Sequence, residues 1–410
     1  MQVRTCMGRR VHRRGLIWPP MAERCDAIVV GAGPAGASAA ITLRRFRPEW
    51  RVALLDRSDF PRDKACGDGI AGDAFDELAR IGVHGVEGDA PEIWDLHLTG
   101  PNGAMVVGRG RKSNRVIRRI VFDARLVDAA IDAGARLHRH HVRQVDVADR
   151  MVTVDGAFTA PVLIAADGAN SVIRRRLGIA PPADRHRALA VRAYADAADG
   201  QDAQYIDMIG EGWPSYAWSF PLEDGKANIG YGRRLTGLDG HARDALLANL
   251  QHLAAGPADP NSIAMHPLPL STGRPRPDHG RVLLTGAAAG LINPLTGEGI
   301  FYAIASGRMA AIAALRSSEP GRMYRSMMRR RFSRHFATTS VLARLLDHPA
   351  MFSLGIDAVC DPRAFADLAD IGLGEGVMTP HLLGSLLRAG RSHLNPRSGA
   401  IPVDIREAYV

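Results

Sequence analysis

The segment DFPRDKACGDGIAG, residues 59–72, combines one thiol with three glycines in a short stretch of chain. A thiol can take part in proton transfer, and glycine lets a backbone approach a flat or charged ligand closely. Cys66 could therefore be a catalytic group, or it could be only a small packing residue. Which of the two applies depends on what the rest of the chain places beside this loop.

A second set of spaced glycines precedes the loop. In CDAIVVGAGPAGASAAITLRRF an apolar run leads into a glycine turn and a helix, and the next strand, RVALLDRS, ends in an acid. This is the context of the dinucleotide-binding fingerprint, in which a helix N-terminus meets a pyrophosphate and the acid accepts a ribose hydroxyl. A tight turn without a ligand is the alternative. The predicted nucleotide-binding residues are Gly31, Gly33, Pro34, Ala35, Gly36, Asp56 and Arg57.

These motifs need a Rossmann-like scaffold, and the remaining patterns supply one. The segment 122–134 has helical spacing, 162–178 reads as a strand that enters a turn and a basic helix, and 281–315 repeats strand, glycine loop and helix. Alternating, aromatic-bearing strands between 188 and 270 indicate an antiparallel sheet. We therefore predict an α/β fold: an FAD-binding domain from 25–187 and 271–315, an inserted mainly antiparallel β-sheet substrate domain at 188–270, and C-terminal helices at 316–410.

Composition limits the partners of this 410-residue chain. A net charge of +9 and a pI near 9.9 favour anionic partners, but aromatic residues are only 6% and no nucleic-acid module occurs, so nucleic acid is not expected. The four cysteines form no CxxC pair, which argues against zinc, any other metal site and disulfides, and for a reducing cytoplasm. Residues 1–24 are expected to be a disordered basic extension. No apolar run is long enough for a membrane span.

Five segments carry a family resemblance across residues 25–315. VVGAGPAG, FPRDKACGDG, LIAADGANSVIRR and GLINPLTGEGI resemble the geranylgeranyl reductase family of FAD-dependent oxidoreductases, within the larger para-hydroxybenzoate hydroxylase-like group. YAWSFPLEDGKANIGYG is similar to the family pattern Tyr-x-Trp-x-Phe-Pro, followed after eight residues by Gly-x-Gly. The first and third segments are shared with many FAD hydroxylases, whereas the second and the last indicate prenyl reductases.

The resemblance implies a role for several residues. Cys66 and Gly67 would lie beside the flavin and assist turnover. Tyr216, Trp218 and Phe220 share one face of a strand and would wall the cavity above the flavin, although the pattern alone would make them sheet core. Arg119 would lie near the cofactor phosphates, unless it forms a solvated basic pair with its neighbour. The other cofactor-binding residues that the resemblance implies are Asp167, Gly168, Gly286, Gly297, Gly299 and Ile300.

One residue departs from the family pattern. Where the family usually reads Gly-Asp-Ala-Ala, this chain has Ala287 in place of the acid that would bond a ribityl hydroxyl. One lost bond costs about 1–3 kcal/mol, or about tenfold to a hundredfold in affinity. We expect weaker FAD retention, with a flavin-poor or inactive protein as the alternative. The amides of residues 297–299, at a helix start, would stabilise negative charge on the flavin by about 0.3–2 kcal/mol.

The resemblance implies an enzyme that reduces carbon–carbon double bonds of a geranylgeranyl, polyprenyl or menaquinone side chain. That reaction needs a hydride from reduced flavin, an apolar cavity and a positioned proton source. NAD(P)H and ferredoxin are both open as the reductant. The main alternative is a flavin monooxygenase, either a hydroxylase or a halogenase, of an apolar or aromatic substrate, although the Trp-x-Trp-x-Ile-Pro pattern of flavin halogenases is absent. A non-catalytic flavin or lipid binder is a third interpretation.

The segment 322–346 predicts a basic amphipathic helix. Tyr324, Met328, Phe332 and Phe336 recur every four residues among arginines. Packing against the protein is the favoured expectation, and contact with an anionic membrane surface is the alternative because the expected substrates are lipids. We expect a cytoplasmic protein and leave open a peripheral position at the inner face of the cell membrane. The oligomeric state is also open.

Overall fold

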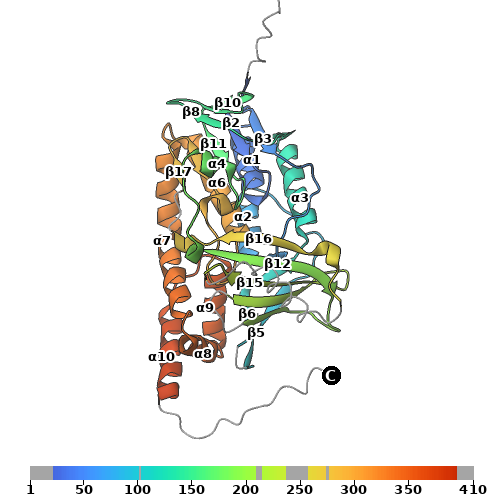
Figure 1. Cartoon of the computed structure of the whole chain (residues 1–410), viewed down its shortest axis with the longest axis vertical. Coiled ribbons are helices and arrows are strands. Elements are labelled where there is room, and N and C mark those ends of the chain that lie inside the picture. Colours follow the sequence, from blue (N-terminus) through green and yellow to red (C-terminus); the bar gives the residue numbers. More distant parts are fainter. Residues whose placement is uncertain (1–21, 101–102, 209–214, 237–256, 274–276, 395–410) are drawn as a thin grey trace, which may run out of the picture.

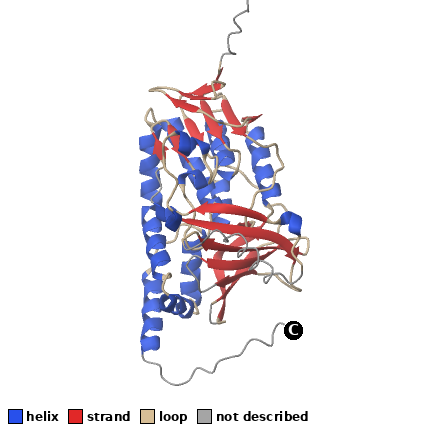
Figure 2. Cartoon of the chain, in the orientation of Figure 1, coloured by secondary structure: helices blue, strands red, loops and turns tan. Residues whose placement is uncertain are grey.

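The computed structural model describes residues 22–100, 103–208, 215–236, 257–273 and 277–394. A nucleotide-binding layer forms one end of the molecule, a broad sheet crosses its middle, and C-terminal helices run along one side (Figure 1). Figure 2 shows the same separation of strands and helices. Of the expected N-terminal extension, residues 1–21 lie outside the described part, and Glu23–Arg24 already form strand β1. The predicted α/β class is confirmed.

The nucleotide-binding layer is a six-stranded sheet in the order β17-β18-β11-β2-β3-β7. Its strands run parallel except β17 at the edge. The four inner strands, β18, β11, β2 and β3, are almost wholly apolar because helices cover one face and a small sheet covers the other. The strands are β2 (Ala27–Val30), β3 (Val52–Asp56), β7 (Arg136–Arg139), β11 (Leu163–Ala165), β17 (Asp278–His279) and β18 (Val282–Leu284). The small sheet contains β1 (Glu23–Arg24), β10 (Phe158–Ala160), β9 (Val152–Val154) and β8 (Val145–Val147).

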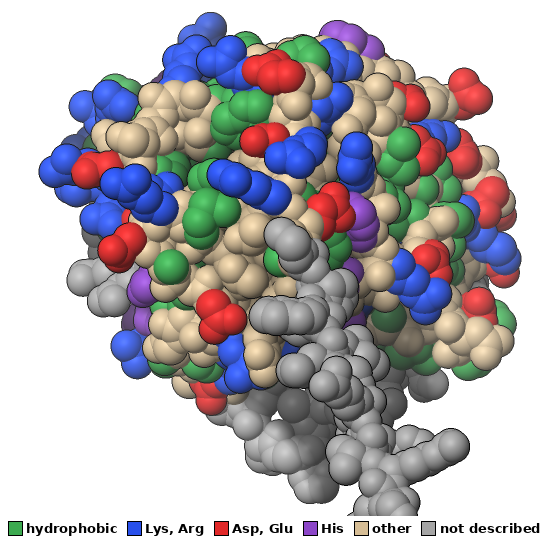
Figure 3. All heavy atoms as spheres, turned by 90° about the horizontal axis from the view of Figure 1, so that it is seen from above, with side chains coloured by type: hydrophobic (Ala, Val, Ile, Leu, Met, Phe, Trp, Pro, Cys, Tyr) green, Lys and Arg blue, Asp and Glu red, His purple; other side chains and the backbone are tan. Residues whose placement is uncertain are grey.

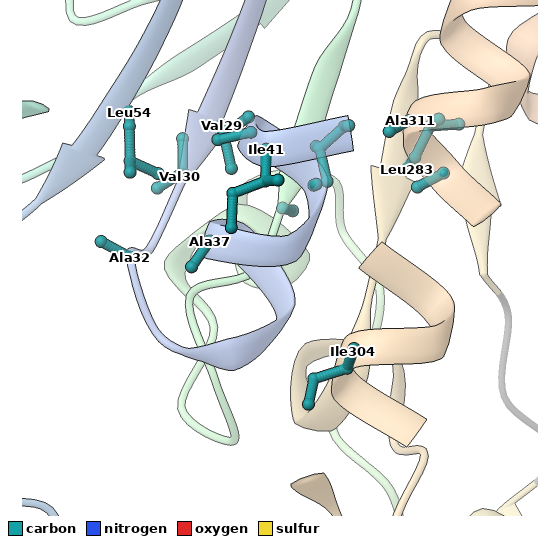
Figure 4. Close-up of a cluster of buried hydrophobic side chains, with 14 of the residues drawn as sticks. Val29, Val30, Ala32, Ala37, Ile41, Leu54, Leu283, Ile304 and Ala311 are labelled. Atoms are coloured by element: carbon teal, nitrogen blue, oxygen red, sulfur yellow. The ribbon is translucent and has the colours of Figure 1, made fainter. Parts of the chain in front are cut away.

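The face of the six-stranded sheet opposite the small sheet is covered by three helices: α1 (Pro34–Phe46), α3 (Arg119–Asp132) and α6 (Ile300–Arg316). Small residues let α1 and α6 pack closely, and a β-carbon on Gly307 would lie 2.1 Å from the carbonyl oxygen of Ala35. Figure 4 shows Ile41 of α1 beside Val29 of β2, with Ile304 of α6 lower in the view as part of the same core. This core fixes the start of α1, where the glycine turn lies.

A second, eight-stranded sheet has the order β16-β12-β15-β14-β13-β5-β6-β4. It is antiparallel except where β13 pairs with β5. Three of its strands come from residues 69–116, a stretch that the sequence analysis assigned to the FAD-binding domain. That contribution was hard to see because several exposed positions of β6 carry charged side chains. The strands are β4 (Gly69–Ile70), β5 (Ile93–Thr99), β6 (Met105–Val116), β12 (Arg187–Asp196), β13 (Gln204–Met208), β14 (Ser215–Pro221), β15 (Lys226–Arg234) and β16 (Ala264–Pro269).

The C-terminal helices pack beside this second sheet. They are α7 (Pro320–Leu345), α8 (Pro349–Ala358), α9 (Pro362–Leu373) and α10 (Pro380–Leu394). Helix α9 contacts β6, and α10 packs on α8 and α9. Among the described helices, none combines the length and the hydrophobicity needed to cross a bilayer. Two short helices, α2 (Gly72–Ala79) and α4 (Val172–Arg176), follow the cysteine loop and β11.

Candidate active site

The glycine turn after β2 leaves no room for side chains. Gly31 has φ +96°, and a β-carbon there would lie 2.3 Å from the carbonyl oxygen of Ala166. On Gly36 it would lie 1.7 Å from the carbonyl oxygen of Gly31. Gly33 is more open, since the nearest atom to such a carbon is 3.6 Å away on Arg62. The first amides of α1 therefore face open space, with no acidic side chain in the first turn to cap them.

Asp56 ends β3 beside this turn. Its carboxylate accepts hydrogen bonds from the amides of Ala32 (2.8 Å) and Ser58 (3.0 Å), which fix its orientation. A carboxylate has about four acceptor positions, so it can accept further bonds from a ligand. Arg57, the next residue, is exposed at the same cavity.

Arg119, the first residue of α3, is buried in the cavity wall. Its guanidinium donates two hydrogen bonds to Asp123, at 2.7 and 2.8 Å. Arg62 lies 3.3 Å from the same carboxylate and 3.9 Å from that of Asp56, so the two arginines and the two acids form one charged cluster. Arg118 instead pairs with Asp224 at 2.7 Å and does not line the cavity. Arg119 and Arg118 therefore do not form the solvated basic pair that was the alternative from the sequence.

The cysteine loop is tied down by buried polar groups. Asp68 is buried, has a positive φ of 60°, and accepts hydrogen bonds from Tyr194 (2.7 Å) and Asn228 (2.8 Å). Asn228 also donates to the carbonyl oxygen of Cys66, at 2.9 Å. Burial raises the pKa of the Cys66 thiol, and the guanidinium of Arg119 opposes this effect only in part. The thiol therefore retains its proton at neutral pH.

The aromatic motif is a cross-strand arrangement. Trp218 on β14 pairs with Gly230 on β15, and Tyr216 pairs with Gly232. A β-carbon on Gly230 would lie 1.9 Å from the ring of Trp218. The spacing between Tyr-x-Trp and Gly-x-Gly therefore matches the β14–β15 hairpin, which places a glycine opposite each of these two aromatic rings.

The glycines of the cysteine loop likewise leave room for the aromatic rings of β14. A β-carbon on Gly67 would lie 3.2 Å from the indole nitrogen of Trp218, and one on Gly69 would lie 3.2 Å from the ring of Phe220. The indole nitrogen donates to Asn228 at 2.9 Å. Loop and aromatic strand therefore form one packed unit, which explains why the loop is rich in glycine.

The loop before α6 brings a buried acid to the cavity. The hydroxyl of Tyr216 donates to the carbonyl oxygen of Thr296, next to Gly297. Glu298 is only 8% exposed, and its carboxyl accepts a hydrogen bond from the amide of Phe301 at 2.7 Å. Burial raises the pKa of Glu298 to about 7. This residue was not predicted from the sequence, although an acid between two glycines at a helix start was a visible signal.

Two further titratable side chains line the cavity near the thiol. Burial lowers the pKa of Lys64 to about 8, and Arg119 acts in the same direction. Burial also lowers the pKa of His266, on β16, to about 3, so this ring is neutral at physiological pH. Lys64 therefore loses its proton more readily than an ordinary lysine.

One cavity of about 990 Å³ connects these groups. Of the predicted residues, Gly36 and Gly286 do not line it; Gly286 packs against Ala303 of α6 instead. The structure thus brings together residues from segments far apart in the chain. The predicted residues that line the cavity are Gly31, Gly33, Pro34, Ala35, Asp56, Arg57, Cys66, Gly67, Arg119, Asp167, Gly168, Tyr216, Trp218, Phe220, Gly297, Gly299 and Ile300.

The same cavity continues between the C-terminal helices as an apolar tunnel. Every lining residue from position 342 onward is apolar or glycine. The sequence analysis identified these helices but not their role; the paired leucines of HLLGSLLRAG were the available signal. Residues of the tunnel wall include Leu342, Phe352, Ile356, Val359, Phe365, Leu382 and Leu386.

The polar end of the cavity fits FAD in most respects. Asp167 has a buried carboxylate oxygen with no hydrogen-bond partner among the described residues, and burial raises the pKa of this carboxyl. Next to it, Gly168 has φ +79° and no atom within 4 Å of where a β-carbon would be. An unsatisfied acceptor beside open space is what a bound ligand would complete. Ala287 also lines the cavity but has no carboxylate, so the acceptor for a ribityl hydroxyl is absent at this position.

Comparison with solved structures identifies proteins of the same fold. A geranylgeranyl bacteriochlorophyll reductase-like protein from Thermoplasma acidophilum has a TM-score of 0.74 at 21% identity, covering 92% of this chain and 98% of that one. A flavin-dependent brominase has a TM-score of 0.70 at 15% identity, covering 91% and 100%. Fold and cavity together define an FAD-binding oxidoreductase.

Sequence comparison identifies the family. No family model matches the chain. The menaquinone reductase of Mycobacterium tuberculosis is 32% identical over 354 residues, which is 80% of this chain and 85% of the relative. Digeranylgeranylglycerophospholipid reductase 1 of Methanopyrus kandleri is 32% identical over 341 residues, covering 78% and 88%. The chain belongs to the geranylgeranyl reductase family of FAD-dependent oxidoreductases, as its motifs predict.

Proposed function

We propose that this protein reduces carbon–carbon double bonds in the isoprenoid chain of a lipid. The observation that carries the proposal is one continuous cavity. It joins the polar end described above, which we call the FAD cradle, to a wholly apolar tunnel. Such a tunnel gives a polar substrate no hydrogen-bond partner, but it can bury a long hydrocarbon chain. The names of the two relatives, menaquinone reductase and digeranylgeranylglycerophospholipid reductase, support a lipid substrate of this kind.

Several residues would hold the cofactor tightly. The bare amides at the start of α1 bind its pyrophosphate, Asp56 accepts a ribose hydroxyl, and the amides around Gly297 and Gly299 favour negative charge on the ring. FAD, once reduced, supplies the hydride. NAD(P)H and ferredoxin are the candidate reductants, and anaerobic bleaching of the FAD absorbance by each distinguishes them.

The chain itself supplies protons and excludes water. Reduction of an isolated double bond requires a proton as well as a hydride. At the cavity wall the Cys66 thiol is protonated at pH 7, and Glu298, with a pKa of about 7, is protonated in about half of the molecules. Tyr216, Trp218 and Phe220 cover the same region with apolar surface, which keeps bulk water from the reacting bond. Because its raised pKa makes the thiol the weaker acid of the two, we assign Cys66 to relaying a proton and not to being its source.

The test is lipid mass spectrometry of a deletion strain. Loss of the protein should shift one prenyl lipid down by about two mass units for each bond left unreduced, and the intact gene should restore it. Purified Cys66→Ala should keep its FAD spectrum and lose about a hundredfold in turnover. Cys25→Ala changes a buried thiol away from the cavity and should retain wild-type turnover. If no prenyl lipid shifts, the proposed function is wrong.

A further inference from the structure

The apolar tunnel opens to solvent between two helices. Leu345 of α7 and Leu383 and Leu387 of α10 line the cavity, yet they are 47%, 48% and 59% exposed. Single exposed leucines are common, but a group at the rim of a cavity marks a surface that something apolar covers. Figure 1 shows α7 and α10 along the same edge of the molecule. We call these three residues the leucine rim.

The exposed face of α7 leads to this rim. Arg330, Arg334, Val341, Arg344 and Leu345 lie within one face of the helix by their spacing, and each is exposed. The apolar residues of the helix that recur every four positions face inward instead, as the favoured sequence expectation had it. Helix α7 therefore packs on the protein with one face and presents arginines and apolar side chains with the other.

The charge of this face is not neutralised by the protein. Nearby acids are engaged elsewhere, since Asp347 pairs with Arg234 and Asp361 pairs with His381. Figure 3 shows Lys and Arg side chains gathered on the side of the molecule where α7 lies. Within the described residues, no ion pair involves the exposed arginines Arg330, Arg334, Arg344 and Arg391.

We propose that the leucine rim and the arginines around it dock the protein on an anionic lipid bilayer. Cationic side chains flanking apolar ones at a membrane surface combine attraction to acidic headgroups with burial of the apolar groups. The tunnel mouth would then face the acyl region directly, so a long-chain substrate enters without crossing water. This last step depends on the proposed function, whereas the docking itself does not.

Vesicle flotation of the full-length, FAD-loaded protein tests the charge. Wild type should bind phosphatidylcholine vesicles that contain about 30% phosphatidylglycerol much better than pure phosphatidylcholine vesicles. Arg330→Glu/Arg334→Glu should weaken binding to the anionic vesicles at least about tenfold. Arg24→Glu/Arg150→Glu makes the same change in net charge at exposed arginines near the small sheet and should bind as wild type does. Equal loss in both double variants would overturn the proposal.

A second pair of variants tests the rim. Leu383→Ser/Leu387→Ser should bind anionic vesicles about tenfold more weakly than wild type. Ile131→Ser/Val147→Ser removes apolar residues of similar exposure elsewhere and should leave binding unchanged. If the rim variant floats as wild type does, the rim does not enter the bilayer and the proposal is wrong.

Activity separates docking from catalysis. Arg330 and Arg334 do not line the cavity, so their double variant should reduce a detergent-solubilised substrate at the wild-type rate and a vesicle-borne substrate more slowly. If vesicle binding depends on these arginines but the protein reduces no detergent-solubilised substrate, the docking proposal is supported and the proposed function is wrong. If the variant keeps vesicle binding but loses reduction by a ferredoxin, the face binds an acidic protein and the proposal is overturned.

Discussion

The two ends of the cavity place different demands on their residues. At the nucleotide end, backbone atoms approach so closely that a β-carbon on Gly31 would lie 2.3 Å from a carbonyl oxygen. At the tunnel end, side chains such as Ile356 and Phe352 only have to be apolar and fill space. The first end is therefore defined by backbone geometry and the second by polarity and volume. A mutation of the same size should act very differently at the two ends.

The largest effect is expected from one methyl group in the cradle. Gly31→Ala combines a left-handed φ with a carbonyl clash, so it should abolish FAD retention in whatever protein folds. The ratio of absorbance at the flavin band to that of the protein measures this. Gly156→Ala is the matched control, because its φ is also positive, the space beside it is open and it does not line the cavity. If both variants retain flavin equally, steric approach does not define this end.

A bulky residue in the tunnel should act on substrate alone. Ile356→Trp overfills a buried wall position and should lower kcat/KM for a long isoprenoid chain by about a hundredfold, with the FAD spectrum unchanged. Ile356→Leu keeps the volume and should stay within a few-fold of wild type. Loss of flavin in the tryptophan variant would show that the two ends are not independent.

Restoring an acid to the cradle should strengthen cofactor binding. Ala287→Asp adds a hydrogen-bond acceptor at the cavity and should tighten FAD by about tenfold, measured by titration of the apoprotein. Ala287→Val adds volume without an acceptor and should not. An unchanged dissociation constant for the aspartate variant would mean that other contacts already satisfy the ribityl chain.

The smallest effect concerns pH. Burial raises the pKa of Glu298 to about 7, above the ordinary 4.5 of a glutamate, so this carboxyl binds more protons in the folded state between these pH values. Its contribution to stability is therefore complete below about pH 4.5 and is lost as pH rises towards 7. Glu298→Gln should remove this loss and gain thermal stability relative to wild type from pH 5 to pH 8. Parallel melting curves would contradict the raised pKa.

The contrast between the two ends also explains what the sequence could reveal. The cradle, Asp56 and the cysteine loop were readable because close approach and positive φ restrict each position to very few residue types. The tunnel was not, because any apolar residue of suitable volume serves there and the same pattern describes ordinary helix packing.

Residues that act through tertiary contacts were missed for a related reason. Asn228 joins the Cys66 loop to Trp218, but only the pairing of β14 with β15 places its amide there. The strands at 69–116 joined the second sheet through pairings distant in sequence, such as β13 with β5. Local patterns do not encode such partners.

The uniform wall of the tunnel has a consequence for how many bonds are reduced. Because the described residues that line it from position 342 onward carry no polar side chain, none of these side chains fixes a chain at one depth. For an isoprenoid chain, successive double bonds can reach the Cys66 loop by sliding along the same axis. The number of double bonds reduced would then be graded by how far the chain advances before release, and a single site would act processively.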